Sequence, residues 1–109
     1  ELPAGKLDRN EAPENAARRE LLEETGYEAQ RWDFIGTMMP CIGYSDERIH
    51  AYLARDLTYS KRNLDEGEFL ETSRVPMSDL LQQALNASIQ DAKTVIALLW
   101  AEQFLRSPD

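Results

Sequence analysis

Residues 5–27 read GKLDRNEAPENAARRELLEETGY, and this stretch decides the fold. Pro13 suits the first turn of a helix, because the N–H group that proline lacks would have no partner there. Residues 16–24 are all fair helix formers, and Gly26 is a typical residue just after a helix C-terminus. The stretch therefore predicts a loop that starts near Gly5 and a helix that runs from Pro13 to Gly26.

Three glutamates of this helix are predicted to share one side of it. At about 100° per residue, Glu20, Glu23 and Glu24 fall within an arc of roughly 100°. Carboxylates held so close repel one another, so we expect a cation beside this face to offset the repulsion. Arg19 can neutralise part of the charge and pair with Glu11, which lies in the preceding loop. A divalent metal would supply the rest, and the plain alternative is a solvated acidic face.

The spacing of residues 5–26 can be written GX5EX7REUXEEXG, where U is an apolar residue. This pattern resembles the Nudix box and matches it at every specified position, and Tyr27 fills the apolar position that follows. The resemblance implies a Mg²⁺-dependent hydrolase that cleaves the diphosphate of a nucleoside diphosphate linked to another group. Mn²⁺ would fit the same oxygen ligands.

The resemblance also implies a role for each residue of the box. Metal would be held by the carbonyl of Ala4 and by the carboxylates of Glu20 and Glu24. Glu23 would be a further ligand or would contact one of the ligands. Arg19 would form an orienting pair with Glu11, and both Arg19 and Glu24 would belong to the catalytic set. Gly5 would let the backbone bend beside the substrate, and Gly26 would end the helix.

A second acidic segment is predicted to complete the site. A hydrolase needs a group that accepts a proton from water, and the glutamates of the box are already assigned to metal. Residues 65–71 read DEGEFLE and resemble the acidic catalytic loop of bacterial ADP-ribose pyrophosphatases. The resemblance implies Glu66 as the general base and Glu68 as a further metal ligand, or the reverse. A solvated turn is the alternative.

Two more segments bear on the substrate. Residues 40–57 and 91–99 also resemble bacterial ADP-ribose pyrophosphatases, which implies ADP-ribose as substrate with AMP and ribose 5-phosphate as products. Glu47 could line the substrate pocket or be an ordinary edge-strand residue. A proline that helps mark this group is replaced by Ile42, and Pro40 stands two places earlier. Another nucleoside diphosphate sugar, such as GDP-mannose, therefore remains open. A non-hydrolytic nucleotide sensor is a third alternative, and the intact set of glutamates argues against it.

Composition limits the kind of protein. The chain has 109 residues, enough for one domain over residues 1–109, and its net charge of −8 argues against binding nucleic acid. Cys41 is the only cysteine, which excludes a disulfide within the chain and favours the cytoplasm. We expect Cys41 to be a half-buried packing residue. No apolar run is long enough to span a bilayer.

The rest of the chain predicts a mixture of strands and helices. Strands are expected at residues 31–39, 47–57 and 68–75, and helices at 78–85, where Ser78 would be the cap, and at 92–105, where Asp91 would be. Together these elements predict an α/β fold, and the resemblance sharpens this to a Nudix α/β/α sandwich with a mixed sheet. Because related proteins carry strands before the box, we expect such strands upstream of Glu1. A homodimer is implied by analogy alone.

Overall fold

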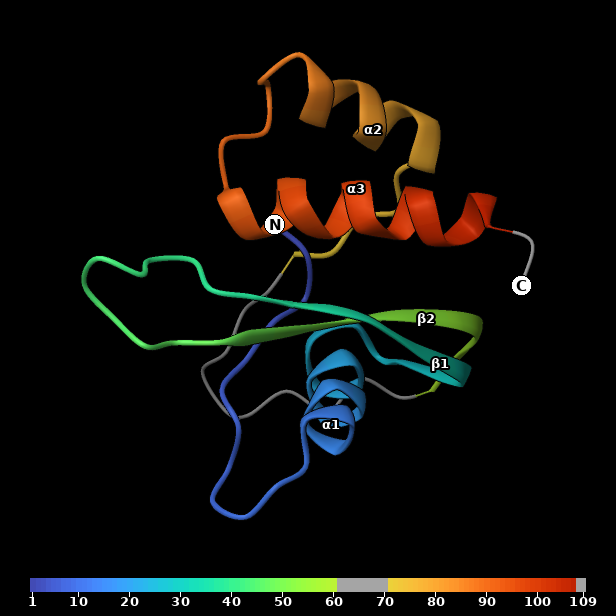
Figure 1. Cartoon of the computed structure of the whole chain (residues 1–109). Coiled ribbons are helices and arrows are strands. Elements are labelled where there is room, and N and C mark those ends of the chain that lie inside the picture. The colour runs from blue at the N-terminus through green and yellow to red at the C-terminus, as the bar shows by residue number, and fades with distance from the viewer. Residues whose placement is uncertain (61–70, 108–109) are drawn as a thin grey trace. The chain divides into compact units, whose positions relative to one another are not determined.

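The computed structural model describes residues 1–60 and 71–107. Along the chain the elements are α1 (Pro13–Thr25), β1 (Tyr27–Met38), β2 (Ile49–Tyr59), α2 (Met77–Leu85) and α3 (Ala92–Arg106) (Figure 1). The predicted mixture of helices and strands is confirmed. A strand over residues 68–75 is not: residues 71–75 have no regular structure, and residues 68–70 lie outside the described part of the chain.

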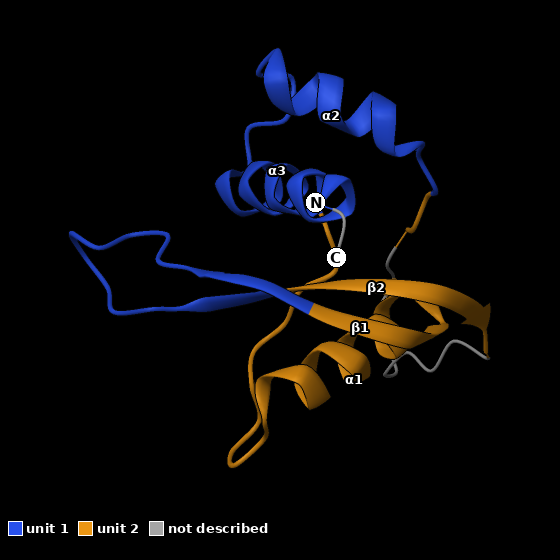
Figure 2. Ribbon diagram, turned by 45° about the vertical axis from the view of Figure 1, so that its right-hand side comes forward, with its two compact units in different colours: residues 1, 34–51, 74–109 blue, residues 2–33, 52–73 orange. Residues whose placement is uncertain are grey.

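The chain divides into two compact units, which Figure 2 shows in different colours. Unit 1 comprises Glu1, Phe34–Ala51 and Arg74–Asp109, and it contains α2 and α3. Unit 2 comprises Leu2–Asp33 and Tyr52–Ser73, and it contains α1. The strands β1 and β2 pair with each other as a two-stranded antiparallel hairpin, and each strand contributes to both units.

Helix α1 begins and ends where the sequence predicts. Pro13 is its first residue, and Gly26 follows its last turn with a φ of 79°, a left-handed conformation that glycine adopts without strain. The N–H of Gly26 donates to the carbonyl of Leu22 at 2.9 Å, which satisfies a carbonyl at the helix end. Gly26 turns the chain directly into β1, so this strand starts at Tyr27, four residues before the predicted Arg31.

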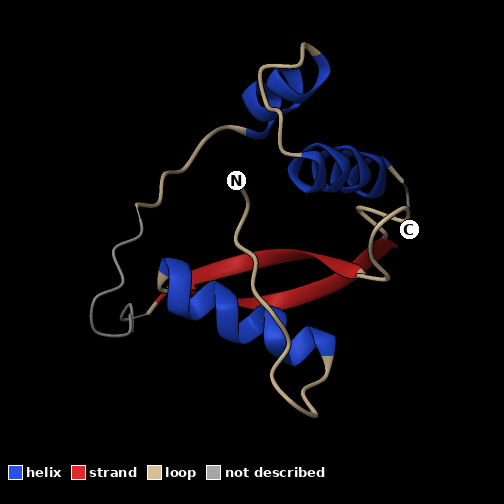
Figure 3. Cartoon of the chain, turned by 90° about the vertical axis from the view of Figure 1, so that its left-hand side faces the viewer, coloured by secondary structure: helices blue, strands red, loops and turns tan. Residues whose placement is uncertain are grey.

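Aromatic side chains hold the strands and α1 together within unit 2. Trp32 donates from Nε1 to the carbonyl of Ala29 at 2.9 Å, and its ring meets Tyr52 edge to face with centroids 6.4 Å apart. Arg18 of α1 lies over the Trp32 ring, 5.1 Å from its centroid, a cation–π contact. Figure 3 shows α1 alongside the strands that carry these rings. Trp32 is therefore a packing residue.

In unit 1, the two C-terminal helices pack on each other. Asp91 caps α3 as predicted, because its side chain accepts the N–H of Thr94 at 3.2 Å. Ser78 is not a cap: α2 starts after Pro76 and has no side-chain cap. The buried residues of α3 are Leu98 and two smaller residues, Thr94 and Ala101.

The loop between the strands, residues 39–48, departs from expectation. Cys41 is exposed rather than half buried, and Met39 is exposed whereas Met38 is buried. Strand β2 begins at Ile49, so Glu47 belongs to this loop and not to a strand. No helix among the described residues is long and apolar enough to cross a membrane.

Candidate functional site

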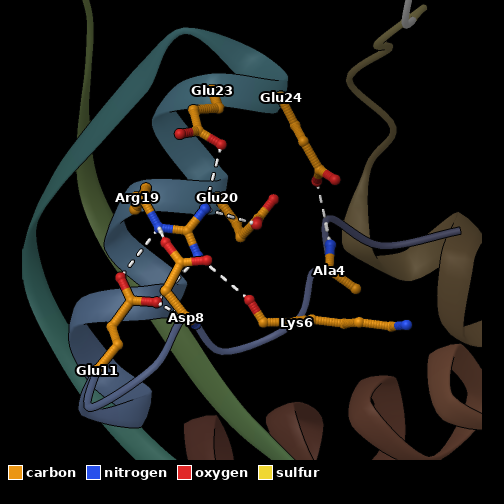
Figure 4. A network of polar contacts seen from close by, with 8 residues as sticks. All are labelled: Ala4, Lys6, Asp8, Glu11, Arg19, Glu20, Glu23 and Glu24. Carbon is orange, nitrogen blue, oxygen red and sulfur yellow. Dashed lines mark hydrogen bonds and ion pairs between the residues drawn. The ribbon is translucent and has the colours of Figure 1, made fainter.

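The candidate site lies in unit 2, where the segment before α1 folds against the helix (Figure 4). At its centre the guanidinium of Arg19 binds Glu11 through two nitrogens. Nε donates to Glu11 Oε2 and Nη2 donates to Oε1, each at 2.9 Å. This two-pronged geometry is the strongest that arginine and a carboxylate form. The predicted pairing of Arg19 with Glu11 is confirmed.

The third nitrogen of Arg19 serves two glutamates of the helix. Nη1 donates to Glu20 Oε1 at 2.9 Å and to Glu23 Oε2 at 3.3 Å (Figure 4). One guanidinium thus bridges the loop to two of the three clustered glutamates. It relieves part of the repulsion that the sequence predicts for this face.

The loop has a further anchor that the sequence analysis missed. The N–H of Asp8 donates to Glu11 Oε1 at 2.8 Å, and Asp8 Oδ2 lies 3.4 Å from Arg19 Nε. Arg19 Nη2 also donates to the carbonyl of Lys6 at 3.2 Å. Asn10 has a φ of 64°, a conformation that asparagine tolerates. The Asp8–Arg9–Asn10 run, rich in turn formers, was the available signal for this turn.

The ion pair stays charged over a wide pH range. Hydrogen bonds from Arg19, and then from the N–H of Asp8, lower the pKa of Glu11 from 4.5 to about 2. The pKa of Arg19 is raised above its ordinary value, chiefly by its hydrogen bonds to Glu11. Glu11 is only 16% exposed and Arg19 27%, so solvent screens the pair incompletely. This ion pair therefore links the loop to α1 throughout the neutral pH range.

Two carboxylates approach the backbone of Ala4 and Gly5. The N–H of Ala4 donates to Glu24 Oε2 at 3.1 Å. A Cβ atom built on Gly5 would overlap the carboxyl group of Glu20, at its carbon and at both oxygens. Gly5 is therefore required for space, because any side chain would displace Glu20. Figure 4 shows Glu20 and Glu24 on the side of α1 that faces Ala4.

The chemistry of these groups fits a hard divalent cation. The four predicted ligands, which are the Ala4 carbonyl and the carboxylates of Glu20, Glu23 and Glu24, offer only oxygen atoms, the donors that Mg²⁺ and Mn²⁺ take. The cradle that Gly5 leaves for Glu20 brings carboxylate and backbone together without a side chain between them. Within residues 1–60 and 71–107, no three acidic, histidine or cysteine side chains are already gathered around one metal position.

The structure brings most of the predicted site residues to one place. The segment before α1 supplies Ala4, Gly5 and Glu11, and α1 supplies Arg19, Glu20, Glu23 and Glu24. Glu47 belongs to unit 1, where its N–H donates to Ser45 Oγ at 2.9 Å. Glu66 and Glu68 lie outside the described residues, so their predicted roles stay predictions.

Comparison with known proteins identifies the family of this chain. The NUDIX domain family matches residues 1–98. The chain is 41% identical over 104 residues to the ADP-ribose pyrophosphatase of Bacillus subtilis, and it is 35% identical over 101 residues to the GDP-mannose pyrophosphatase of Cronobacter sakazakii. These alignments cover 94% and 90% of the chain but 56% and 52% of the relatives, so the chain spans about half their length.

Two further matches cover a similar share of the chain. The methanol dehydrogenase activator of Bacillus methanolicus is 38% identical over 104 residues, which is 94% of this chain and 56% of that protein. A solved structure described as an ADP compounds hydrolase superposes with a TM-score of 0.77 and 28% identity, covering 92% of this chain and 54% of that one. Taken with the box around α1, the matches show that this chain belongs to the Nudix family and has its α/β fold.

Proposed function

We propose that the protein is a Nudix pyrophosphohydrolase that cleaves the diphosphate of ADP-ribose to AMP and ribose 5-phosphate with Mg²⁺. The observation that carries the proposal is the approach of Glu20 and Glu24 to the Ala4–Gly5 backbone, where Gly5 leaves room for a carboxylate. The 41% identity to an ADP-ribose pyrophosphatase supports the substrate.

In this proposal, the metal is held by the Ala4 carbonyl and by Glu20, Glu23 and Glu24. When bound, Mg²⁺ would offset the charge of the diphosphate and lower the pKa of water. The protein itself fixes the position of these ligands. Arg19 and Glu11 tie the loop to α1, and the N–H of Ala4 orients Glu24. Mn²⁺ would serve the same ligands.

Three residues complete the proposal on the strength of resemblance alone. Glu66 is proposed to accept a proton from the attacking water and Glu68 to be a further ligand, and both lie outside the described residues. Glu47 is proposed to contact the substrate. A general base must reach the water that it deprotonates, so Glu66→Gln would remove turnover without removing metal binding.

A second substrate is favoured by a specific observation. Several relatives at 31–35% identity are named GDP-mannose pyrophosphatases, and Ile42 occupies the position where proline helps mark the ADP-ribose group. The surroundings of the diphosphate would be the same for both substrates. The nucleoside and the sugar would then be read by residues outside the box.

The setting of the enzyme follows from the same reasoning. We propose a homodimer in the cytoplasm that acts on a small nucleotide and not on nucleic acid. The negative net charge of −8 disfavours a nucleic acid backbone, whereas a single nucleotide diphosphate needs only the local positive charge of a metal.

A substrate panel tests the proposed function. Purified protein is incubated with Mg²⁺ and with ADP-ribose, GDP-mannose or a dinucleotide polyphosphate, and products are followed by phosphorus NMR. We expect AMP and ribose 5-phosphate from ADP-ribose at the highest kcat/KM. A higher value for GDP-mannose would favour the second substrate. If no panel member is hydrolysed but one raises Tm, the protein is a nucleotide sensor and the proposal is wrong.

A further inference from the structure

Arg19 binds its partners unequally. It holds Glu11 through two separate nitrogens at 2.9 Å each, whereas Glu20 and Glu23 share the single nitrogen Nη1, at 2.9 and 3.3 Å. Asp8 lies farther from the guanidinium, at 3.4 Å from Nε. The contact with Glu11 therefore has the strong fork geometry, and the contacts with the helix glutamates are each one-pronged.

The carboxylates around Arg19 also outnumber its single positive charge. Four carboxylates, those of Asp8, Glu11, Glu20 and Glu23, lie within ion-pair distance of this one guanidinium. One positive charge cannot balance four negative ones, so the helix face keeps an excess of negative charge that draws a cation. Glu20 and Glu23 are also proposed metal ligands. An oxygen that accepts a hydrogen bond from Nη1 is less available to a metal.

We propose that Arg19 is a positioning residue with two separate tasks. Through Nε and Nη2 it holds Glu11 at all times, which keeps the loop beside α1. Through Nη1 it is the resident counter-cation of Glu20 and Glu23 in the metal-free protein, and it releases them when a divalent metal binds. This inference rests on the proposed metal-dependent function.

The exposure of Glu20 and Glu23 sets how strongly their contacts with Nη1 should oppose metal binding. Glu20 is 18% exposed and Glu23 is 40% exposed, so the Nη1 contacts are only partly shielded from water. Ion pairs of this kind shift an equilibrium by up to about fivefold. Release of Nη1 should therefore weaken metal binding by about two- to fivefold relative to a protein in which that contact is absent. A competition of this size would let Arg19 keep Glu20 and Glu23 in place in the metal-free protein without preventing metal from binding.

Metal titrations of two variants separate the tasks. Mn²⁺ alone, and then Mg²⁺ alone, is titrated by calorimetry into wild type, Arg19→Gln and Glu11→Gln, and each protein is melted with chelator and with saturating metal. Glu11→Gln is the matched control, because it weakens the tie to the loop but leaves Arg19 next to Glu20 and Glu23.

We expect Arg19→Gln to bind Mn²⁺ about two- to fivefold more tightly than Glu11→Gln. Its Tm should fall in chelator and recover more with metal than that of wild type. Glu11→Gln should lose Tm equally with and without metal, and should bind no more tightly than wild type. If both variants change metal affinity alike, Arg19 only anchors the loop and the inference is wrong.

Three further outcomes have a definite meaning. If Arg19→Gln does not fold, Arg19→Lys decides, because lysine has a single nitrogen and cannot form the two-pronged contact with Glu11 while a separate nitrogen serves Glu20 and Glu23. Arg19→Lys must then bind Mn²⁺ more tightly than Glu11→Gln, and equal or weaker binding overturns the inference. If wild type binds neither metal at millimolar concentration, the proposed metal-dependent function fails and takes this inference with it. If wild type binds metal but Arg19→Gln and Glu11→Gln have the same metal affinity, the inference about Arg19 is wrong and the proposed function still stands.

Discussion

At the scale of single residues, the site depends on how closely carboxylates approach the backbone and one guanidinium. Glu20 occupies the space where a side chain on Gly5 would be, and Glu24 accepts the N–H of Ala4. Both contacts set the direction in which a carboxylate points, and direction decides whether oxygen ligands meet a metal.

Gly5→Ala should therefore lower activity much more than stability. The added methyl group would displace the flexible end of Glu20, which costs little in folding but moves a proposed ligand. We expect kcat to fall about 10²-fold, with only a small change in Tm. The matched control is Gly43→Ala, because no atom lies within 4 Å of its added carbon. Unchanged kinetics in Gly5→Ala would contradict the claim that activity depends on the space that Gly5 leaves for Glu20.

Glu11 should give the stability of the protein a dependence on acid. Its pKa is about 2 in the folded protein and 4.5 ordinarily, so folding favours the charged form. The stabilisation is fully present above pH 4.5 and is lost as the pH falls towards 2. The Tm difference between wild type and Glu11→Gln should be constant from pH 5 to 7 and shrink below about pH 4. A difference that does not change with pH would contradict the assignment.

At this scale the sequence predicted the residues of the box but not all of their contacts. The spacing of Glu11 and Arg19 was enough to foresee their pairing, because a loop that returns to the helix brings them together. The sharing of Arg19 Nη1 by Glu20 and Glu23 was not foreseen. Rotamers decide which of several nearby carboxylates a guanidinium meets, and a sequence pattern carries no rotamers.

At the scale of elements, a single glycine at the end of α1 links the box to the sheet. Gly26 reverses the chain into β1 with no intervening loop, and the carbonyl of Gly26 accepts the N–H of Ser60 at 2.7 Å. Arg18 continues this link from the side of the helix by covering Trp32. These contacts place α1 against the strands from its C-terminal end and from the side that carries Arg18.

Gly36 should be as important to unit 1 as Gly5 is to the site. Its φ of 155° favours glycine, and an added Cβ would lie 2.6 Å from the ring of Trp100 in α3. Gly36→Ala should lower the free energy of unfolding by about 1–3 kcal/mol, because an aromatic ring cannot move aside as a flexible chain end can. Urea denaturation measures this, again with Gly43→Ala as control. A loss below about 0.5 kcal/mol would contradict the described packing of Gly36.

Elements with strong local signals were predictable and those without were not. Pro13, Gly26 and Asp91 mark helix ends by their own chemistry, and all three are where they were expected. The start of β1 was placed four residues late, although residues 27–30 already alternate between apolar and polar, with Glu28 and Gln30 exposed and Ala29 buried. Ser78 resembled a cap, but the turn at Pro76 had already started α2.

At the scale of the whole chain, family membership and local chemistry support different conclusions. The NUDIX match and the TM-score of 0.77 show the family and the fold. The chain spans about half the length of the two pyrophosphatases compared above. The identity of its substrate is therefore a proposal and does not follow from the family. The net charge of −8 agrees with the proposed function, in which a metal would add to the positive charge of Arg19 at the site.

The proposed metal site is tested most directly by the turnover of ADP-ribose in Mg²⁺ by wild type and by Glu24→Gln, with Tm measured on the same samples. Glutamine keeps the shape of the side chain and removes the charge that a metal needs. If Glu24 holds the metal, wild type releases AMP and ribose 5-phosphate, and Glu24→Gln loses turnover by at least about 10³-fold with its Tm nearly unchanged. Turnover by Glu24→Gln at close to the wild-type rate would contradict this role of Glu24.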